Sequence, residues 1–231
     1  MKENGVSAAS PPPASPSRVA DRIARQTLAR RGPDYAGEVR RLLDAGLGVM
    51  RTCGTTSRPR VADIVAAAGL SNDAFYRHFA SKEALVAAIL EDGTERLGDY
   101  LAHQMAKEST PEGKVGAWVA GVLSQAADDE IAAATLAVLW NAGSIGAGVA
   151  SGPASASGPL AVLLREPFAA LGSADPELDA SLAAHAAVGR LGDHLWRRAR
   201  PARGEIEHIV RFCLAAPRSG RTRTGAANTR T

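Results

Sequence analysis

The sequence has little of what marks secreted, membrane or metal-binding proteins. It contains two cysteines among 231 residues, Cys53 and Cys213, which lie in different predicted helices and favour reduced thiols over a disulfide. Its longest apolar run, near residues 131–140, is too short and too rich in alanine to span a bilayer. The N-terminus has no apolar segment typical of a secretory signal. We therefore expect a protein of the cytoplasm.

Sequence patterns of catalysis are also missing. There is no nucleophile elbow, no glycine-rich phosphate loop and no His/Cys/Asp cluster with the spacing of metal ligands. These gaps predict a protein that is not an enzyme and that needs no metal or other cofactor. Cys53 allows one alternative, a redox sensor, but its place in a predicted core helix favours simple burial.

Charge alone does not identify a partner, because the net charge is only +3. Its distribution is more informative. Residues 1–17 are rich in Pro, Ser and Ala, and residues 18–31 hold five arginines and one acid, so we expect residues 1–32 to be a disordered basic arm. Two interpretations stay open for this arm: contact with DNA phosphates or the minor groove, and a solvated linker. A second disordered basic tail is expected at residues 217–231.

The most informative stretch is residues 61–85, VADIVAAAGLSNDAFYRHFASKEAL. Apolar residues at helical spacing predict a helix over residues 61–68. Gly69 suits the left-handed conformation that ends a helix, and Ser71 is a strong N-cap for the next one. The stretch therefore predicts two helices joined by a tight turn.

In the second of these helices, one face is fixed by two aromatic residues. Phe75 and Phe79 are four residues apart and must both face inward. The opposite side then exposes a candidate DNA-reading face of Asn72, Asp73, Tyr76 and Arg77. After it, Ser81 caps a further helix that we expect to reach about Gln104.

These residues resemble a known family. GLSNDAFYRHFASKEAL is similar to the signature of tetracycline-repressor-like (TetR) regulators, and residues 39–54 resemble that family's first helix. The resemblance implies an all-α fold, with an N-terminal three-helix helix-turn-helix domain followed by a helical ligand-binding and dimerisation domain. It also implies phosphate contacts from Tyr76, His78 and Lys82. Base contacts are implied for Asn72, Asp73 and Arg77.

Two further residues complete the predicted DNA-binding set. Where the family has a Thr-Thr pair before its second helix, this chain reads Ser57-Arg58-Pro59-Arg60 and is one residue longer. Arg60 is expected to replace the phosphate contact of that pair. With Ser71 the set is Arg60, Ser71, Asn72, Asp73, Tyr76, Arg77, His78 and Lys82.

The domain boundaries follow from the helix signals. A DNA-binding domain is expected at residues 33–80, beginning with a helix near Pro33-Asp34, and a connecting helix at 81–106. Thr110 and Pro111 read as the cap and first residue of a helix that opens a second domain at 107–216. Within it, residues 141–159 are rich in Gly, Ser and Ala and predict a flexible connection.

The last two long helices have apolar bands too broad for one core. They predict a homodimer interface across a two-fold axis, and the resemblance implies the same arrangement. The expected interface residues are Leu182, Gly189, Gly192, Trp196, Ile206, Ile209, Val210 and Cys213.

The resemblance also implies a small-molecule effector, held in an apolar cavity within residues 112–200. The candidate lining residues are Trp118, Thr135, Trp140, Asn141, Phe168 and His185. For the aromatic residues and His185 the alternative, a place in the core, is the commoner one in proteins.

Together these features predict a dimeric repressor that leaves a palindromic DNA operator when a small apolar molecule binds. Two alternatives stay open: an activator of the same fold, and a DNA-coating protein without sequence preference.

Overall fold

The computed structural model describes residues 18–143 and 157–219, and every regular element within these ranges is helical. By their internal contacts the residues form two units, Met1–Arg40 and Arg41–Thr231. The first unit contains, in its described part, the N-terminal portion of helix α1, which runs over Arg18–Cys53. We call residues 41–80 the head and residues 81–219 the body.

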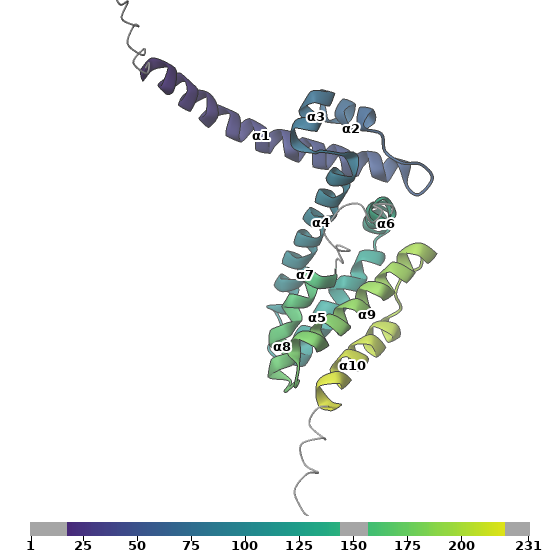
Figure 1. Ribbon diagram of the computed structural model, residues 1–231. Coiled ribbons are helices and arrows are strands. Elements are labelled where there is room, and N and C mark those ends of the chain that lie inside the picture. The colour runs from purple at the N-terminus through teal and green to yellow at the C-terminus, as the bar shows by residue number, and fades with distance from the viewer. Residues whose placement is uncertain (1–17, 144–156, 220–231) are drawn as a thin grey trace, which may run out of the picture. The chain divides into compact units, whose positions relative to one another are not determined.

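Two short helices follow α1, and the chain then enters its long connecting helix α4. The three helices are α2 (Val61–Ala68), α3 (Asn72–His78) and α4 (Lys82–Met105). The predicted connecting helix is confirmed, and it leads from α3 to the body (Figure 1).

The body contains the remaining helices. They are α5 (Pro111–Leu123), η1 (Ser124–Ala126), α6 (Asp129–Gly143), α7 (Ser157–Ala161), η2 (Val162–Leu164), α8 (Arg165–Ala170), α9 (Pro176–Arg197) and α10 (Arg203–Ser219). Helix α5 packs against α4, α9 and α10, and α8 packs against α9. The Thr110 cap is confirmed, since its side chain accepts a hydrogen bond from the Gly113 amide.

The start of the first helix corrects one prediction. The helix begins at Arg18 and not near Pro33, so residues 18–32 of the expected disordered arm are helical. Their sequence holds five Arg and three Ala, residues of high helix propensity, and this outweighs Gly32 and Pro33. Residues 1–17 lie outside the described part of the chain.

Two boundaries also differ from prediction. Helix α10 continues to Ser219, so the first residues of the tail predicted at 217–231 are helical. Residues 220–231 lie outside the described part of the chain. Helix α6 extends to Gly143 and α7 begins at Ser157, so most of the predicted flexible connection is also outside it.

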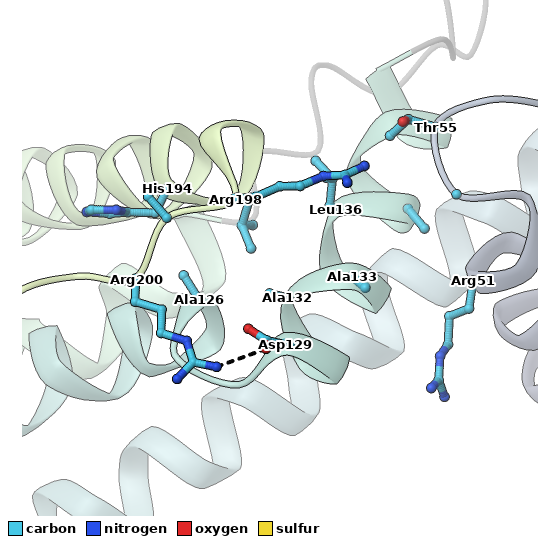
Figure 2. A pocket seen from close by; sticks show the side chains of 14 residues that line it. Arg51, Thr55, Ala126, Asp129, Ala132, Ala133, Leu136, His194, Arg198 and Arg200 are labelled. Atoms are coloured by element: carbon cyan, nitrogen blue, oxygen red, sulfur yellow. Dashed lines mark ion pairs between the residues drawn. The ribbon is translucent and has the colours of Figure 1, made fainter.

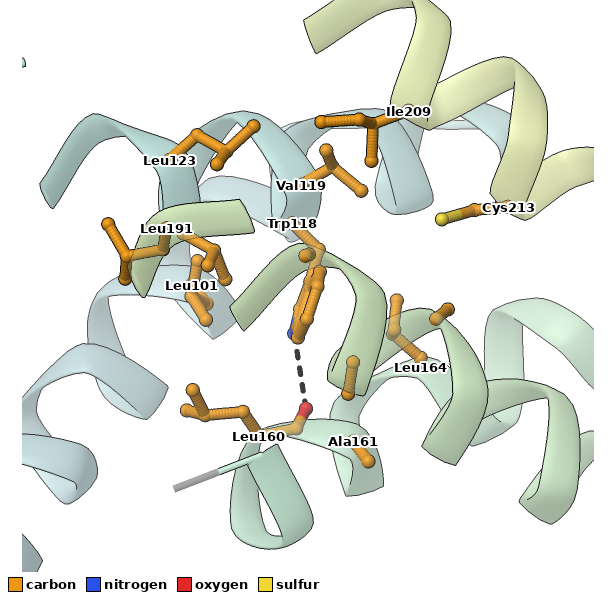
Figure 3. Packing of buried hydrophobic residues seen from close by; sticks show 14 of the residues in the cluster. Leu101, Trp118, Val119, Leu123, Leu160, Ala161, Leu164, Leu191, Ile209 and Cys213 are labelled. Carbon is orange, nitrogen blue, oxygen red and sulfur yellow. Dashed lines mark hydrogen bonds between the residues drawn. The ribbon is translucent and has the colours of Figure 1, made fainter. Parts of the chain in front are cut away.

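The core of the body is organised around Trp118 (Figure 3). The Trp118 side chain is fully buried, and its Nε1 donates a hydrogen bond of 3.1 Å to the carbonyl oxygen of Leu160. Leu101 from α4, Phe168 from α8 and Leu191 from α9 belong to the same buried cluster. One indole thus connects α5 to α7, although the two helices are far apart in the sequence.

Close packing of α4 on α5 explains a glycine in this core. A Cβ atom added to Gly121 would lie 2.5 Å from Cδ2 of Leu101, a side chain that is itself fully buried. Only glycine lets the two helices approach to this distance.

Helices α9 and α10 are joined by a charged cluster as well as by apolar contacts. Arg190 donates to both Asp193 and Glu205, and His194 Nε2 lies 3.1 Å from Glu205 Oε1. The Arg190 hydrogen bond is the main reason why the pKa of Glu205 is lowered. This cluster fixes the turn between the two helices.

We expect Trp118→Ala to lower the free energy of unfolding by about 3–5 kcal/mol, because it leaves a large cavity and removes a buried hydrogen bond. Trp118→Phe should cost clearly less, since it retains most of the apolar volume. Chemical denaturation followed by circular dichroism measures both. An equal loss for the two variants would contradict the role of the indole volume in this core.

Candidate nucleic-acid interface

The turn between α2 and α3 is built by local hydrogen bonds. Gly69 has φ 63°, the left-handed conformation predicted for it, and the Leu70 amide donates to the Val65 carbonyl at 2.9 Å. The Ser71 hydroxyl oxygen accepts from the Ala74 amide at 3.2 Å, which confirms Ser71 as the N-cap. The entry of the chain into α3 is therefore set by residues 69–74 themselves.

Two phenylalanine rings determine which side of α3 faces outward. Phe75 is fully buried and Phe79 nearly so, with their ring centroids 5.9 Å apart. Ala74 is buried beside them. The opposite face exposes Asn72, Asp73, Tyr76 and Arg77, as the sequence predicts.

Tyr76 is the most prominent side chain of this face, with 58% of its surface exposed. Its ring meets the edge of Phe75 at a centroid distance of 5.2 Å, so one side of it is held in place. The hydroxyl is left available to donate a hydrogen bond, for example to a phosphate oxygen.

Lys82, Ser71 and His78 complete the predicted DNA-binding set around α3. The Ser81 hydroxyl oxygen accepts from the Ala84 amide and so caps α4, which places Lys82 at its first residue. Its Nζ lies 3.9 Å from a carboxylate oxygen of Glu83. Ser71 uses its oxygen as the cap but keeps its O–H as a donor. His78 is half-buried at the end of α3.

Arg60 differs from the other predicted contacts, because it already holds an anion. Its Nε and Nη2 donate to the two carboxylate oxygens of Asp63 at 2.9 and 2.8 Å. This pair raises the pKa of Arg60 and lowers the pKa of Asp63. A phosphate would have to share the guanidinium with Asp63, so Arg60 offers less free charge than its sequence position indicates.

The predicted effector residues lie in different surroundings. Trp118 and Phe168 are fully buried in the packed core. Asn141 is buried on α6 and donates to the Ala137 carbonyl, and Thr135 is half-buried on the same helix. The remaining two, Trp140 and His185, are exposed, so neither takes the alternative place in the core. Trp140 packs on Trp196, and His185 hydrogen-bonds Ser157 and the Ser181 carbonyl.

A pocket of about 480 Å³ is lined by none of these six residues (Figure 2). It lies between the turn that follows α1, helix α6 and the end of α9. Its lining comprises Arg51, Gly54, Thr55, Ala126, Asp129, Ala132, Ala133, Leu136, Ala137, His194, Leu195, Arg198, Ala199 and Arg200. Sequence reasoning did not find this site, because nothing local indicates that residues near 51, 130 and 200 meet.

The predicted dimer residues divide into two groups. Leu182 and Trp196 are more than half exposed, Gly189 is exposed, and Gly192 is half-buried. Val210 and Ile206 on α10 are half-buried.

Ile209 and Cys213 are instead buried in the core of the chain itself, which corrects their assignment to the interface. Burial also raises the pKa of the Cys213 thiol to about 11. The apolar band of α10 is broad because one part of it packs on α5 and another part remains exposed, as at Phe212.

Within residues 18–143 and 157–219, none of the helices combines the length and the apolar composition that crossing a bilayer requires. In the same residues, no three His, Cys, Asp or Glu side chains are grouped so that they would hold a metal ion.

Comparison with solved structures identifies the fold. A TetR-family regulator described from Mesorhizobium loti superposes with a TM-score of 0.59 at 16% identity, covering 80% of this chain and 97% of that one. Reduced Escherichia coli NemR gives 0.58 at 16% identity, with coverage of 78% and 97%. The Bacillus subtilis regulator FadR, in complex with stearoyl-CoA, gives 0.53 at 14% identity, with coverage of 77% and 98%.

Comparison of sequences identifies the head. No curated protein matches the chain. Residues 55–89 match the family model of bacterial regulatory proteins, tetR family, and this segment holds every residue of the predicted DNA-binding set. The model does not extend to residues 39–54. The sequence match thus covers the segment around α2 and α3, and the fold of the chain is that of solved TetR-family regulators.

Proposed function

We propose that the protein is a dimeric repressor that covers a palindromic operator and is released from it by a small molecule. The observation that carries this proposal is the exposed face of α3, where Asn72, Asp73, Tyr76 and Arg77 stand over the buried Phe75. A short helix with a fixed orientation and polar side chains on its outer side suits reading of base edges in the major groove.

Dimerisation is proposed from the amount of sequence that one head can read. Helix α3 has 7 residues, about two turns, and Ala74 and Phe75 among them are buried. The few side chains that remain can distinguish only a few base pairs, which is not enough to select one site in a genome. Two heads must therefore bind together. The partly exposed apolar side chains of α9 and α10 supply the surface for pairing: Leu178, Leu182, Trp196 and Phe212.

Repression by occupancy is favoured over activation. An activator needs a surface for a specific contact with the transcription machinery, and the basic ends of this sequence are low in the aromatic and aliphatic side chains that anchor such contacts. A small-molecule effector is supported by likeness to FadR of Bacillus subtilis, whose structure holds stearoyl-CoA. We place the protein in the bacterial cytoplasm, on the nucleoid when it is bound to its operator.

A DNA-coating protein is the second candidate, and selection of DNA from a random-sequence library separates the two. The full chain should enrich one palindromic sequence, and deletion of its gene should raise transcription from the promoter that contains this sequence. Recovery of DNA without a common sequence would support the coating protein. A fall in the transcript on deletion would support an activator.

Some residues of the head should position it on the DNA backbone, and others should recognise particular bases. Tyr76→Ala and Lys82→Ala should weaken binding to all sequences alike, and Lys82→Ala should also reduce the salt dependence by about one phosphate contact. Asn72→Ala should relax the preference at particular base pairs, at a cost of about 1–3 kcal/mol at each.

Titrations of the selected operator and of its single-base variants, at several salt concentrations, measure these effects. Lys107→Ala is the control, since it removes one positive charge from the far end of α4, beyond the helix end at Met105. Equal loss at every operator position for Asn72→Ala would remove Asn72 from the reading face.

A charged side chain in the proposed dimer interface should prevent dimerisation. Leu182→Glu and Trp196→Glu should give a monomer at micromolar concentration, because a dimer would have to bury an unpaired carboxylate. Ile131→Glu is the matched control, an exposed apolar residue on α6 and outside both helices. Analytical ultracentrifugation gives the mass, and a wild-type monomer that still binds a single half-site specifically would refute the proposal.

A further inference from the structure

We propose that the pocket between the α1–α2 turn, α6 and the end of α9 binds an organic anion: a small molecule with an apolar body and one carboxylate or phosphate group. This deepens the proposed function, because it names a site and a ligand class for the effector. The binding claim itself rests on the pocket alone.

The apolar part of the pocket lining suits an apolar body. Five of its lining side chains are alanines on η1, α6 and the α9–α10 connection, and Leu136 and Leu195 add larger apolar surface. Its volume of about 480 Å³ falls within the range of sites that hold small organic molecules. Small side chains leave this space open, and an aliphatic chain or a flat ring would fill it.

The rim of the pocket is positively charged. Three arginines line it, Arg51, Arg198 and Arg200, against one carboxylate, Asp129. Arg200 Nη2 pairs with Asp129 Oδ2 at 2.9 Å, and Arg51 pairs with Glu130, which lies outside the lining. Among the described residues Arg198 has no ion pair, and its side chain extends from the end of α9 toward Leu136 and Thr55 (Figure 2).

Arg198 holds this place in an unfavourable backbone conformation. Its φ is 50°, and it is the one residue other than glycine with a positive φ in the described part of the chain. The position after a helix commonly takes this conformation, but glycine is the residue that adopts it without steric cost. An arginine that is retained here at a cost in stability suggests that its side chain has a function.

The pocket joins segments that carry different functions. Arg51 at the end of α1, and Gly54 and Thr55 in the turn after it, belong to the head, whereas the remaining lining residues belong to the body. A molecule that contacts both segments binds most tightly when the head has one particular position relative to the body. Such a ligand distinguishes two states, which is what an effector of DNA binding must do.

Calorimetric titration of the DNA-free protein tests the binding claim, with decanoate and decyl phosphate as anionic probes and decanol as the neutral match. We expect both anions to bind, and decanol at least about tenfold more weakly, since a hydrogen bond to a charged group is lost. If only one of the two anions binds, the result shows whether the pocket prefers a carboxylate or a phosphate. No binding by either, or equal binding by decanol, overturns the proposal.

Three variants locate the site. Arg198→Gln should weaken decanoate at least about tenfold, whereas Arg197→Gln, the control, removes the same charge from an exposed neighbour that does not line the pocket. Ala133→Trp should fill the space and abolish binding. Arg198→Gly should weaken decanoate while raising Tm by about 2–4 °C, because it relieves the backbone strain. Unchanged affinity in Arg198→Gln and Ala133→Trp would place the ligand elsewhere and overturn the proposal.

Titration of decanoate into the complex with selected DNA separates this inference from the proposed function. Binding through Arg198 without release of DNA would sustain the site and contradict its role as the effector site. Release of DNA by decanoate that Arg198→Gln does not affect would sustain ligand control and overturn this pocket.

Discussion

The structure of the head depends on the burial of two aromatic rings beneath α3. A helix of 7 residues does not hold together in water by its own hydrogen bonds, because nucleation is too costly. Phe75 and Phe79 anchor it to the head, and the Ser71 and Ser81 caps satisfy amide groups at the starts of α3 and α4. The same burial fixes the outer face, so the stability of the helix and its presentation of polar groups to DNA have one cause.

Charged neighbours on the surface of the head then determine which side chains are available to a DNA phosphate. The predicted anion-binding residues are not equivalent, because Arg60 is engaged by Asp63 in a paired hydrogen bond, whereas Tyr76 is exposed and only its ring is held. In the body, the charged cluster of Arg190, His194 and Glu205 closes the α9–α10 turn, immediately before the strained Arg198 and the pocket. Among the described residues, the one residue other than glycine with a positive φ thus lies at the candidate ligand site.

The parts of this structure that sequence predicts are those with local causes. Gly69, Ser71, Ser81 and Thr110 act within three or four residues of themselves, and each was placed correctly. The pocket was not predictable, since it forms only when distant segments meet. The apolar bands of α9 and α10 were recognised, but periodicity cannot separate a side chain that packs on its own chain, such as Ile209, from one that would meet a partner, such as Leu182.

The central claim is that α3 enters the major groove through its Asn72 and Tyr76 face, once in each half of a two-fold site. Dimethyl sulfate footprinting of the selected operator tests this directly, because it reports the guanine N7 atoms in the major groove. The account predicts two protected blocks whose centres lie about 10 base pairs, or a multiple of that, apart on one face of the duplex. Specific binding that leaves every guanine N7 reactive would contradict it.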